Sequence, residues 1–241
     1  MERWTRRVAV VTGASVGIGA CIAADLVKKG MKVAGLARRS EKVEELSKSL
    51  ASAKGKLYAV KCDVTKESEV KEAFKWVKSN LGVVDVLINN AGVLILGNIK
   101  ESSPDDWRKV FDLNVLGLSM CTKEALQLMK EKGVDDGHIV HINSICGHTP
   151  PSPTSVMYYA SKHAVTALTE GLRRELVNQK SKIRVTSVSP GLVKTDMPPK
   201  QCFETLPFLN PEDVSNSVLY VLGAPPHVQI HELIILPVGA P

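Results

Sequence analysis

The chain has 241 residues, of which 44% are hydrophobic and 23% are charged, and its formal net charge is +6. This length suits one large domain, and the hydrophobic share can build a sizeable core, which excludes a disordered tail. The lysines and arginines are dispersed and not interleaved with aromatic residues, so the positive charge does not indicate a nucleic-acid partner. No apolar run reaches the ~18 residues that a membrane span needs.

The five cysteines, at positions 21, 62, 121, 146 and 202, form no closely spaced pair. Scattered thiols are typical of a reducing compartment and argue against a disulfide framework or a structural zinc site. His138 and His141 lie three positions apart, but no cysteine or carboxylate cluster completes a metal site, so no metal is expected. The apolar run after the first basic residues is too short for a signal peptide. We therefore expect a cytoplasmic protein.

Short β-branched runs alternate with longer amphipathic segments along the whole chain. The runs that predict strands are residues 7–12, 32–37, 57–62, 85–90, 138–143, 184–189 and 232–237. The segments with helical spacing are residues 18–29, 41–53, 67–80, 104–131, 157–179 and 211–222. This alternation predicts an α/β fold, with a parallel sheet that is covered by helices on both faces.

Several helix ends carry recognisable signals. Ser103-Pro104 and Asn210-Pro211 each place a cap residue before a proline at the first helical position. Gly30 and Gly133 stand where helices are expected to end. Because ligands of such folds bind beyond the carboxyl ends of the strands, the segments that follow the strands form the candidate site. These segments are residues 12–19, 37–39, 62–64, 89–92, 143–148 and 189–197.

The first of these segments, TGASVGIG (12–19), joins the first strand to the first helix. Its glycines Gly13, Gly17 and Gly19 permit a tight turn and a close approach of the backbone to a ligand. The N-terminus of the helix offers free N–H groups to a pyrophosphate. A glycine-rich turn can also be purely structural, but its place between strand and helix favours a dinucleotide site.

The end of the second strand discriminates between cofactors. NAD sites usually carry an acidic residue about 20 positions after the glycine-rich turn. Here Ala37 stands at that place and is followed by Arg38 and Arg39, whose guanidinium groups can clamp a 2′-phosphate. The pair could also be two solvated arginines at a strand end; we interpret it as a site for NADP(H).

The third and fourth strands end in further candidate ligands. Asp63 can accept a hydrogen bond from an adenine amine or simply cap the next helix, and the sequence leaves both open. INNAG (88–92) ends the fourth strand with small residues that let a flat ring system approach.

Later in the chain, YYASK (158–162) sets two tyrosines one turn before a lysine. Positions three and four apart on a helix can share a face, so geometry does not select between Tyr158 and Tyr159.

With these motifs in order, and with Asn114, Ser144 and Pro190-Gly191 between and after them, the sequence resembles the short-chain dehydrogenase/reductase family over essentially the whole chain. The resemblance implies a single-domain, three-layer Rossmann-type fold with a seven-stranded, mostly parallel sheet. It also implies hydride transfer between a nicotinamide and an alcohol or carbonyl. A homodimer or homotetramer that uses the helices of residues 104–131 and 157–179 is expected from the same resemblance.

The resemblance assigns roles to the polar residues. The family spacing Tyr-x-x-x-Lys makes Tyr158 the acid/base, and Lys162, with the positive charge of the oxidised nicotinamide, is expected to lower the tyrosine pKa. Lys162 also bonds the nicotinamide ribose, Ser144 orients the substrate oxygen, and Asn114 holds a water that links Lys162 to solvent.

The segment Pro190–Thr195 is expected to hold the nicotinamide carboxamide. The complete set of expected cofactor residues is Gly13, Ser15, Gly17, Ile18, Gly19, Arg38, Arg39, Asp63, Val64, Asn90, Ala91, Gly92, Tyr158, Lys162, Pro190, Gly191, Val193 and Thr195.

A short substrate lid is expected at about residues 194–210. Its apolar residues either contact a hydrophobic substrate or pack the lid down; they are Met197, Phe203, Leu206, Phe208 and Leu209. Residues 1–4, 135–148, 164–176 and 211–230 resemble the subgroup of dehydrogenase/reductase member eleven and the insect NADP-dependent farnesol dehydrogenases. That subgroup oxidises farnesol, a precursor alcohol of juvenile hormone, or reduces steroid and other carbonyls. A carbonyl or ketosteroid reductase is therefore the alternative, and a non-catalytic NADP-binding scaffold is a remote one.

Overall fold

Parallel strands form the centre of the computed structural model, which describes residues 1–149 and 154–240. All seven expected strands are present in one sheet, in the order β3-β2-β1-β4-β5-β6-β7, and every neighbouring pair is parallel. They are β1 (Val8–Thr12), β2 (Lys32–Ala37), β3 (Lys56–Lys61), β4 (Val86–Asn89), β5 (His138–Ile142), β6 (Arg184–Pro190) and β7 (Glu232–Ile235).

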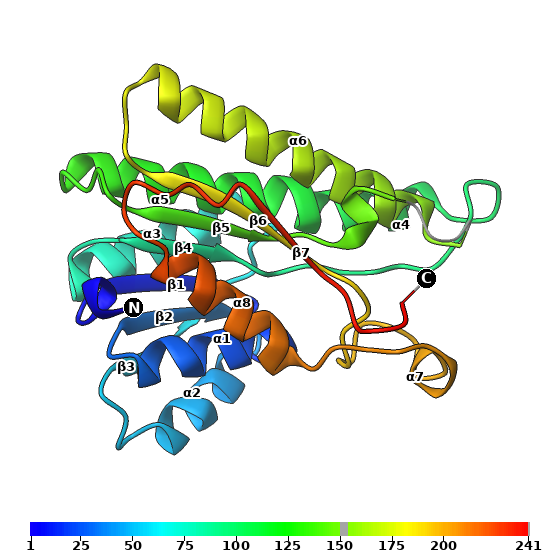
Figure 1. Cartoon of the computed structure of the whole chain (residues 1–241), viewed down its shortest axis with the longest axis horizontal. Coiled ribbons are helices and arrows are strands. Elements are labelled where there is room, and N and C mark those ends of the chain that lie inside the picture. Colours follow the sequence, from blue (N-terminus) through cyan, green and yellow to red (C-terminus); the bar gives the residue numbers. More distant parts are fainter. Residues whose placement is uncertain (150–153, 241) are drawn as a thin grey trace.

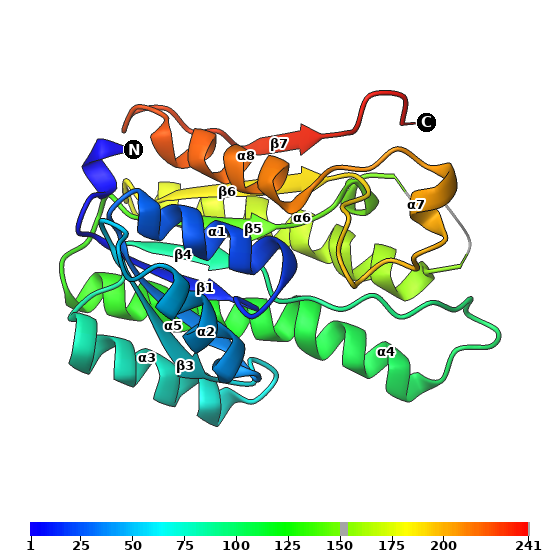
Figure 2. The ribbon, with the colours of Figure 1, turned by 90° about the horizontal axis from the view of Figure 1, so that it is seen from below.

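Helices cover both faces of this sheet, as the alternating pattern predicts (Figure 1). One face carries α1 (Gly17–Lys28), α2 (Ser40–Ser49) and α8 (Pro211–Gly223). The other face carries α3 (Glu67–Leu81), α5 (Leu118–Glu131) and α6 (Val156–Asn178), and α4 (Pro104–Phe111) packs against α6. Figure 2 shows the same three layers from below. The expected Rossmann-type architecture is confirmed.

The residues of β1 alternate between the two cores. Ala9 and Val11 belong to the apolar cluster with α1 and α8, whereas Val8 and Val10 belong to the cluster with α3 and α5. All four are buried, and burying a valine side chain fully stabilises the folded state by about 1.5–3 kcal/mol. A strand with no solvent-facing side is therefore apolar throughout, which is the pattern that the sequence shows.

The expected caps are confirmed. The side chain of Ser103 accepts a hydrogen bond from the backbone N–H of Asp106, 3.1 Å away, and Pro104 occupies the first helical position. Asn210 and Asp213 form a reciprocal capping box at the start of α8. Gly30 and Gly133 follow the ends of α1 and α5 with φ of 88° and 69°, values that glycine adopts without steric cost.

The expected helix over residues 104–131 has these bounds, but it is not a regular α-helix throughout. A π-helical segment, η2 (Asp112–Gly117), separates α4 from α5, so the hydrophobic stripe is shifted there. At Gly117 an added Cβ would lie 3.0 Å from the backbone oxygen of Val64, so the segment passes close to the loop after β3. Three short helices were not expected, because they are too short to show a period: η1 (Glu2–Trp4), η3 (Ile145–Gly147) and α7 (Cys202–Thr205).

The strand order reverses between β1 and β4. The chain leaves β1 toward β2 on one side and leaves β4 toward β5 on the other, which opens a crevice at the carboxyl ends of these strands. In Figures 1 and 2, α7 and the C-terminal tail lie beyond this edge of the sheet.

Over residues 1–149 and 154–240, every helix is too short or too polar to cross a bilayer.

Candidate active site

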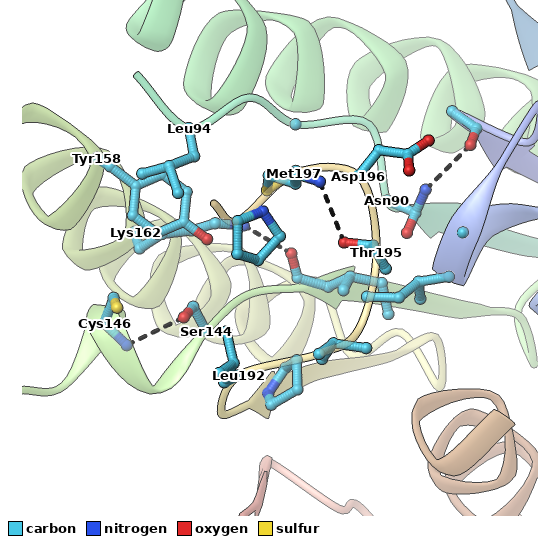
Figure 3. A pocket seen from close by; sticks show the side chains of 18 of the residues that line it. Asn90, Leu94, Ser144, Cys146, Tyr158, Lys162, Leu192, Thr195, Asp196 and Met197 are labelled. Atoms are coloured by element: carbon cyan, nitrogen blue, oxygen red, sulfur yellow. Dashed lines mark hydrogen bonds between the residues drawn. The ribbon is translucent and has the colours of Figure 1, made fainter. Parts of the chain in front are cut away.

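A cavity of about 880 Å³ lies at the carboxyl ends of the strands. Every residue that the sequence analysis assigns to the cofactor or to catalysis lines this cavity, except Gly19 and Asn114. Of the five apolar residues expected in the lid, Met197 and Leu206 line the cavity, whereas Phe203, Phe208 and Leu209 do not. Figure 3 shows Tyr158, Lys162 and Ser144 gathered on one side of it, with Thr195 and Asn90 toward the other. The folded chain therefore brings together segments that lie far apart in the sequence, from Gly13 to Ala240.

The glycine-rich turn has no space for side chains. Gly13 and Gly17 have φ of +67° and +58°. A Cβ on Gly19 would lie 2.4 Å from the backbone oxygen of Gly13 and 2.4 Å from Nδ2 of Asn90, so Gly19 supports the turn from behind. A Cβ on Gly17 would lie 3.3 Å from the methyl group of Thr195, at the opposite wall of the crevice.

The turn is fastened to the end of β4. The amide of Asn90 donates from Nδ2 to the backbone oxygens of Thr12 and Gly13, at 3.0 and 3.3 Å. In return, Oγ1 of Thr12 accepts from the backbone N–H groups of Asn90 and Ala91, both at 3.0 Å. The two strands on either side of the strand-order reversal are thus held at a fixed separation.

The start of α1 is suited to an anion. The residue before its first turn is Val16, which has no side-chain group to cap the helix, and the first turn contains no acidic residue. The unpaired N–H groups of a helix N-terminus attract phosphate through hydrogen bonding and the helix dipole. A pyrophosphate against the glycine-rich turn fits these residues.

Two exposed arginines flank the outer end of the cavity. Arg38 and Arg39 follow the buried Ala37 at the end of β2. The pKa of Asp63 lies below its usual value. Burial acts to raise it, but the hydrogen bonds from Thr65 and the charge of Arg38 together lower it by more. Oδ1 of Asp63 accepts from the backbone N–H and the hydroxyl of Thr65, at 3.1 and 2.8 Å. Asp63 thus forms a turn with Thr65 before α3, whose N-cap residue is Lys66, and the contact of Asp63 with an adenine amine stays a prediction.

The polar side of the cavity is built from β5 and α6. Lys162 is 7% exposed, and its Nζ donates to the backbone oxygen of Ile142 at 2.9 Å. Nζ lies 5.8 Å from the centre of the Tyr158 ring, one turn earlier on α6. Ser144 begins η3, where its hydroxyl accepts from the backbone N–H of Cys146 at 3.1 Å.

Burial is the main influence on the pKa values of Tyr158 and Lys162. It raises the pKa of Tyr158, with a further increase from Cys146, while the Ser144 hydroxyl acts in the opposite direction. It lowers the pKa of Lys162 from 10.5 to about 8. The expectation that Lys162 lowers the tyrosine pKa is therefore not met by the chain alone. The ammonium donates to the Ile142 carbonyl, and desolvation of the phenol is the largest influence on the pKa of Tyr158.

Asn114 lies behind the cavity, in the π-helical segment. Its amide donates to the backbone oxygen of Val93 and to Oγ of Ser161, both at 3.0 Å, and its Oδ1 accepts from the backbone N–H of Val93 at 2.8 Å. Ser161 in turn donates to the backbone oxygen of Tyr158 at 2.7 Å. The side chain of Asn114 thus ties the loop after β4 to α6.

Apolar side chains close the remaining walls. They come from the loop after β4, the loop after β6, the segment before and after α7, and the C-terminal tail: Leu94, Leu96, Leu192, Met197, Leu206 and Leu236. Two backbone hydrogen bonds of 2.8 Å, between Lys194 and Leu209 and between Leu209 and Leu192, close the base of the 194–209 segment. Phe203 and Phe208 pack edge-to-face within it, with ring centres 5.5 Å apart.

Sequence reasoning missed part of this lining. Leu94, Leu96 and Leu236 were not expected at the site, whereas Cys146 lies in the expected segment 143–148, although no role was assigned to it. The position of the loops that carry Leu94 and Leu236 depends on tertiary packing, so no local pattern identifies them.

Fold and site together define a nicotinamide-dependent oxidoreductase. The family model described as short chain dehydrogenase matches residues 7–202, so the chain belongs to the short-chain dehydrogenase family. It is 54% identical to the Farnesol dehydrogenase of Aedes aegypti over 243 residues, which cover 99% of each chain. It is 48% identical to the Dehydrogenase/reductase SDR family member 11 of Gallus gallus, over 98% of each chain.

A solved structure agrees with these relatives. An alcohol dehydrogenase from the archaeon Thermococcus sibiricus, complexed with 5-hydroxy-NADP, superposes with a TM-score of 0.86 at 28% identity. The superposition covers 96% of this chain and 97% of that chain.

Proposed function

We propose that the chain is an NADP(H)-dependent oxidoreductase of an apolar alcohol and its carbonyl, with farnesol and farnesal as the substrate pair. The observation that carries this proposal is one cavity that has Tyr158, Lys162 and Ser144 on one side, leucines on its walls and two arginines at its outer end. The similarity to the Farnesol dehydrogenase of Aedes aegypti supports the choice of alcohol.

NADP(H) fits the residues at the end of β2. Arg38 and Arg39 are exposed at the cavity, and the acidic residue that would hold a ribose 2′-hydroxyl is replaced by Ala37. A 2′-phosphate would meet two guanidinium groups at this place, and Ala37 offers no carboxylate at the strand end, which favours the phosphorylated cofactor. The glycine-rich turn would hold the pyrophosphate, and Val193 and Thr195 would hold the nicotinamide carboxamide.

The roles of the polar residues follow from their chemistry. Ser144 would orient the substrate oxygen with its hydroxyl, and the Tyr158 oxygen would take the hydroxyl proton of the alcohol during oxidation and return it during reduction. The nicotinamide, when bound, supplies the hydride exchange and, in its oxidised form, a positive charge. Lys162 adds a positive charge beside the phenol, and Asn114 would support the path by which the proton reaches solvent.

The segment 194–210 would act as a lid on the substrate. Its base is fixed by the Val193–Leu209 bridge, while Met197 and Leu206 within it are 42% and 46% exposed and line the cavity. A fixed base with exposed apolar side chains suits a cover that folds onto a hydrophobic ligand.

Leu116 and Val177, exposed on η2 and α6, support a homodimer or homotetramer formed through these helices. The five free cysteines support a reducing, cytoplasmic location.

Initial rates with farnesol and either NADP⁺ or NAD⁺ test this proposal. We expect nicotinamide reduction with NADP⁺, and a kcat/KM that is at least tenfold lower with NAD⁺. Oxidation of NADPH by a panel of ketones, without any rate on farnesol, would instead identify a carbonyl or ketosteroid reductase. A preference for NAD⁺ would contradict the assignment of Arg38 and Arg39, and the absence of turnover on every substrate would favour a non-catalytic NADP-binding scaffold.

A further inference from the structure

Two contacts join the end of β5 to one face of α6. Nζ of Lys162 donates to the backbone oxygen of Ile142, and Nδ2 of Asn143 donates to Oγ1 of Thr166, both at 2.9 Å. Ile142 and Asn143 are consecutive, and Lys162 and Thr166 are four positions apart on the helix, so both contacts lie on the same helix face. We call these four residues the strand–helix clamp.

The Thr166 hydroxyl is the centre of this clamp. It accepts from Asn143, and it lies 3.0 Å from the backbone oxygen of Gly147 and 3.2 Å from that of Lys162. A threonine in a helix often donates to the carbonyl four residues earlier, which accounts for the contact with Lys162. The shorter contact, with Gly147, reaches η3. One hydroxyl thus joins α6 to both segments that flank Ser144.

The backbone of Gly147 packs closely against Asn143 and α6. A Cβ on Gly147 would lie 2.8 Å from Nδ2 of Asn143 and 2.8 Å from the backbone oxygen of Lys162. Asn143 is 3% exposed, and within residues 1–149 and 154–240 its buried Oδ1 has no hydrogen-bond partner. Thr166 is therefore the contact that fixes the orientation of the Asn143 amide.

We propose that Thr166 is a positioning residue, whose hydroxyl sets the place of Ser144 relative to Tyr158 and Lys162. Ser144 follows directly on Asn143, whereas Tyr158 and Lys162 precede Thr166 on α6, so the clamp links the two sides of the site through α6 and β5. Thr166 is absent from the cavity lining and acts through these neighbours. The inference rests on the proposed function, in which the three residues act on one substrate oxygen.

A buried hydroxyl can also contribute to stability alone. In that case its loss lowers the melting temperature but leaves kcat of the folded enzyme unchanged. A positioning role lowers kcat, because displacing a catalytic group by about 1 Å costs on the order of 10²-fold in rate. The two roles therefore differ in kcat measured well below the melting temperature.

The test compares Thr166→Val, which keeps the shape and removes the hydroxyl, with Thr166→Ser, which keeps the hydroxyl. We expect kcat for farnesol oxidation with NADP⁺ to fall about 10-fold to 100-fold in Thr166→Val, with KM for NADP⁺ within about twofold of the parent. Thr166→Ser is expected to retain at least half of the parent kcat. Thr166→Ala serves in place of the valine variant if the latter does not fold.

Crystal structures of both variants give a readout that needs no turnover. We expect the valine variant to rotate the Asn143 amide and to change the separation between Ser144 Oγ and Lys162 Nζ, and the serine variant to preserve both. Equal kcat in parent and valine variant, equal loss in both variants, or an unchanged Ser144–Lys162 separation in the valine variant would overturn the inference. Loss of the proposed function has a different signature, since the parent enzyme would then turn over no farnesol while the crystallographic comparison still decides the role of Thr166.

Discussion

The ammonium of Lys162 is bound to the carbonyl oxygen of Ile142, 2.9 Å away, rather than to the phenol of Tyr158. A strand carbonyl is a fixed acceptor, so β5 determines where the positive charge of α6 stands. The charge lies beside the Tyr158 ring at 5.8 Å from its centre, where it acts through space on the phenol. The end of β5 thus controls both Ser144 and the position of Lys162.

Replacing Lys162 by methionine should stabilise the protein at neutral pH. Burial lowers the pKa of Lys162 to about 8, below its value of 10.5 in the unfolded chain, so the unfolded state binds the proton more tightly. Protonation therefore opposes folding below pH 8, and this penalty fades as the pH rises from 8 to 10.5. The variant also leaves the Ile142 carbonyl unpaired, which offsets part of the stabilisation. We therefore expect the free energy of unfolding to rise by about 1–2 kcal/mol at pH 7.

Urea denaturation at pH 7 and at about pH 9.5 measures this gain. It should be smaller at the higher pH, and the exposed control Lys48→Met should change the free energy of unfolding little at either pH. A Lys162→Met variant that is less stable than the parent at pH 7, or a gain that grows with pH, would contradict the stated direction.

The phenol of Tyr158 should stay protonated in the chain without cofactor until the pH is strongly alkaline. Its pKa is raised, first by burial and then by Cys146. A spectrophotometric titration of the phenolate band, taken as the difference between the parent and Tyr158→Phe, isolates this group from the other three tyrosines. A difference signal with a midpoint below about pH 9 would show that Lys162 already outweighs burial, contrary to this account.

Placing a carboxylate at the end of β2 should reverse the cofactor preference. Ala37→Asp combined with Arg38→Ala introduces the acidic residue that holds a ribose 2′-hydroxyl and removes one guanidinium. We expect the ratio of kcat/KM for NADP⁺ over NAD⁺ to fall by about 100-fold, since a lost charge-assisted hydrogen bond costs about 1.5–3 kcal/mol. Lys54→Ala is the control for a removed exposed charge. An unchanged ratio in the double variant would remove Arg38 from the 2′-phosphate site.

Two glycine-to-alanine substitutions should have opposite effects. At Gly19 the added Cβ would lie 2.4 Å from both Gly13 and Asn90, so Gly19→Ala should lose about 1–3 kcal/mol of stability and weaken NADPH binding. At Gly171, in the middle of α6, no atom lies within 4 Å of an added Cβ. Gly171→Ala should gain about 0.5–1 kcal/mol through its higher helix propensity.

Thermal denaturation, with and without NADPH, compares the two variants. The predicted order of melting temperatures is Gly171→Ala, parent, Gly19→Ala. A Gly19→Ala variant with the stability and NADPH affinity of the parent would mean that the glycine-rich turn is not as closely packed as described.

The sequence predicted the features that depend on local patterns. Every strand was located to within two residues at each end, because a strand buried on both faces is a continuous apolar run between polar turns. The caps at Ser103 and Asn210 were predictable because a serine or asparagine before a proline favours the start of a helix. The turn at Gly13 was predictable because glycine permits a tight turn. The location of Ser144 at the ligand edge of the sheet followed from its place after the fifth strand, whereas the place of Tyr158 and Lys162 at the site was implied by the family resemblance.

Features that depend on distant contacts were not predictable in this way. The π-helical segment around Asn114 is so short that its polar and apolar spacing does not differ from that of a regular helix. The acceptor of Lys162 is a backbone carbonyl, which no side-chain pattern reveals. The tyrosine pKa moves opposite to the expected direction because the phenol is buried, which also depends on tertiary packing. The link between Asn143 and Thr166 joins residues 23 positions apart and exists only once β5 and α6 have packed.

The most direct test of the central claim is the initial rate of NADP⁺ reduction by farnesol for the parent, Tyr158→Phe and Tyr159→Phe. Both variants remove one hydroxyl from adjacent residues of the same helix, so they differ only in which phenol is lost. The account predicts a loss of at least 10²-fold in Tyr158→Phe, in line with the usual contribution of a general acid/base, and most of the parent rate in Tyr159→Phe. A rate that survives in Tyr158→Phe, or that is lost equally in both variants, would contradict it.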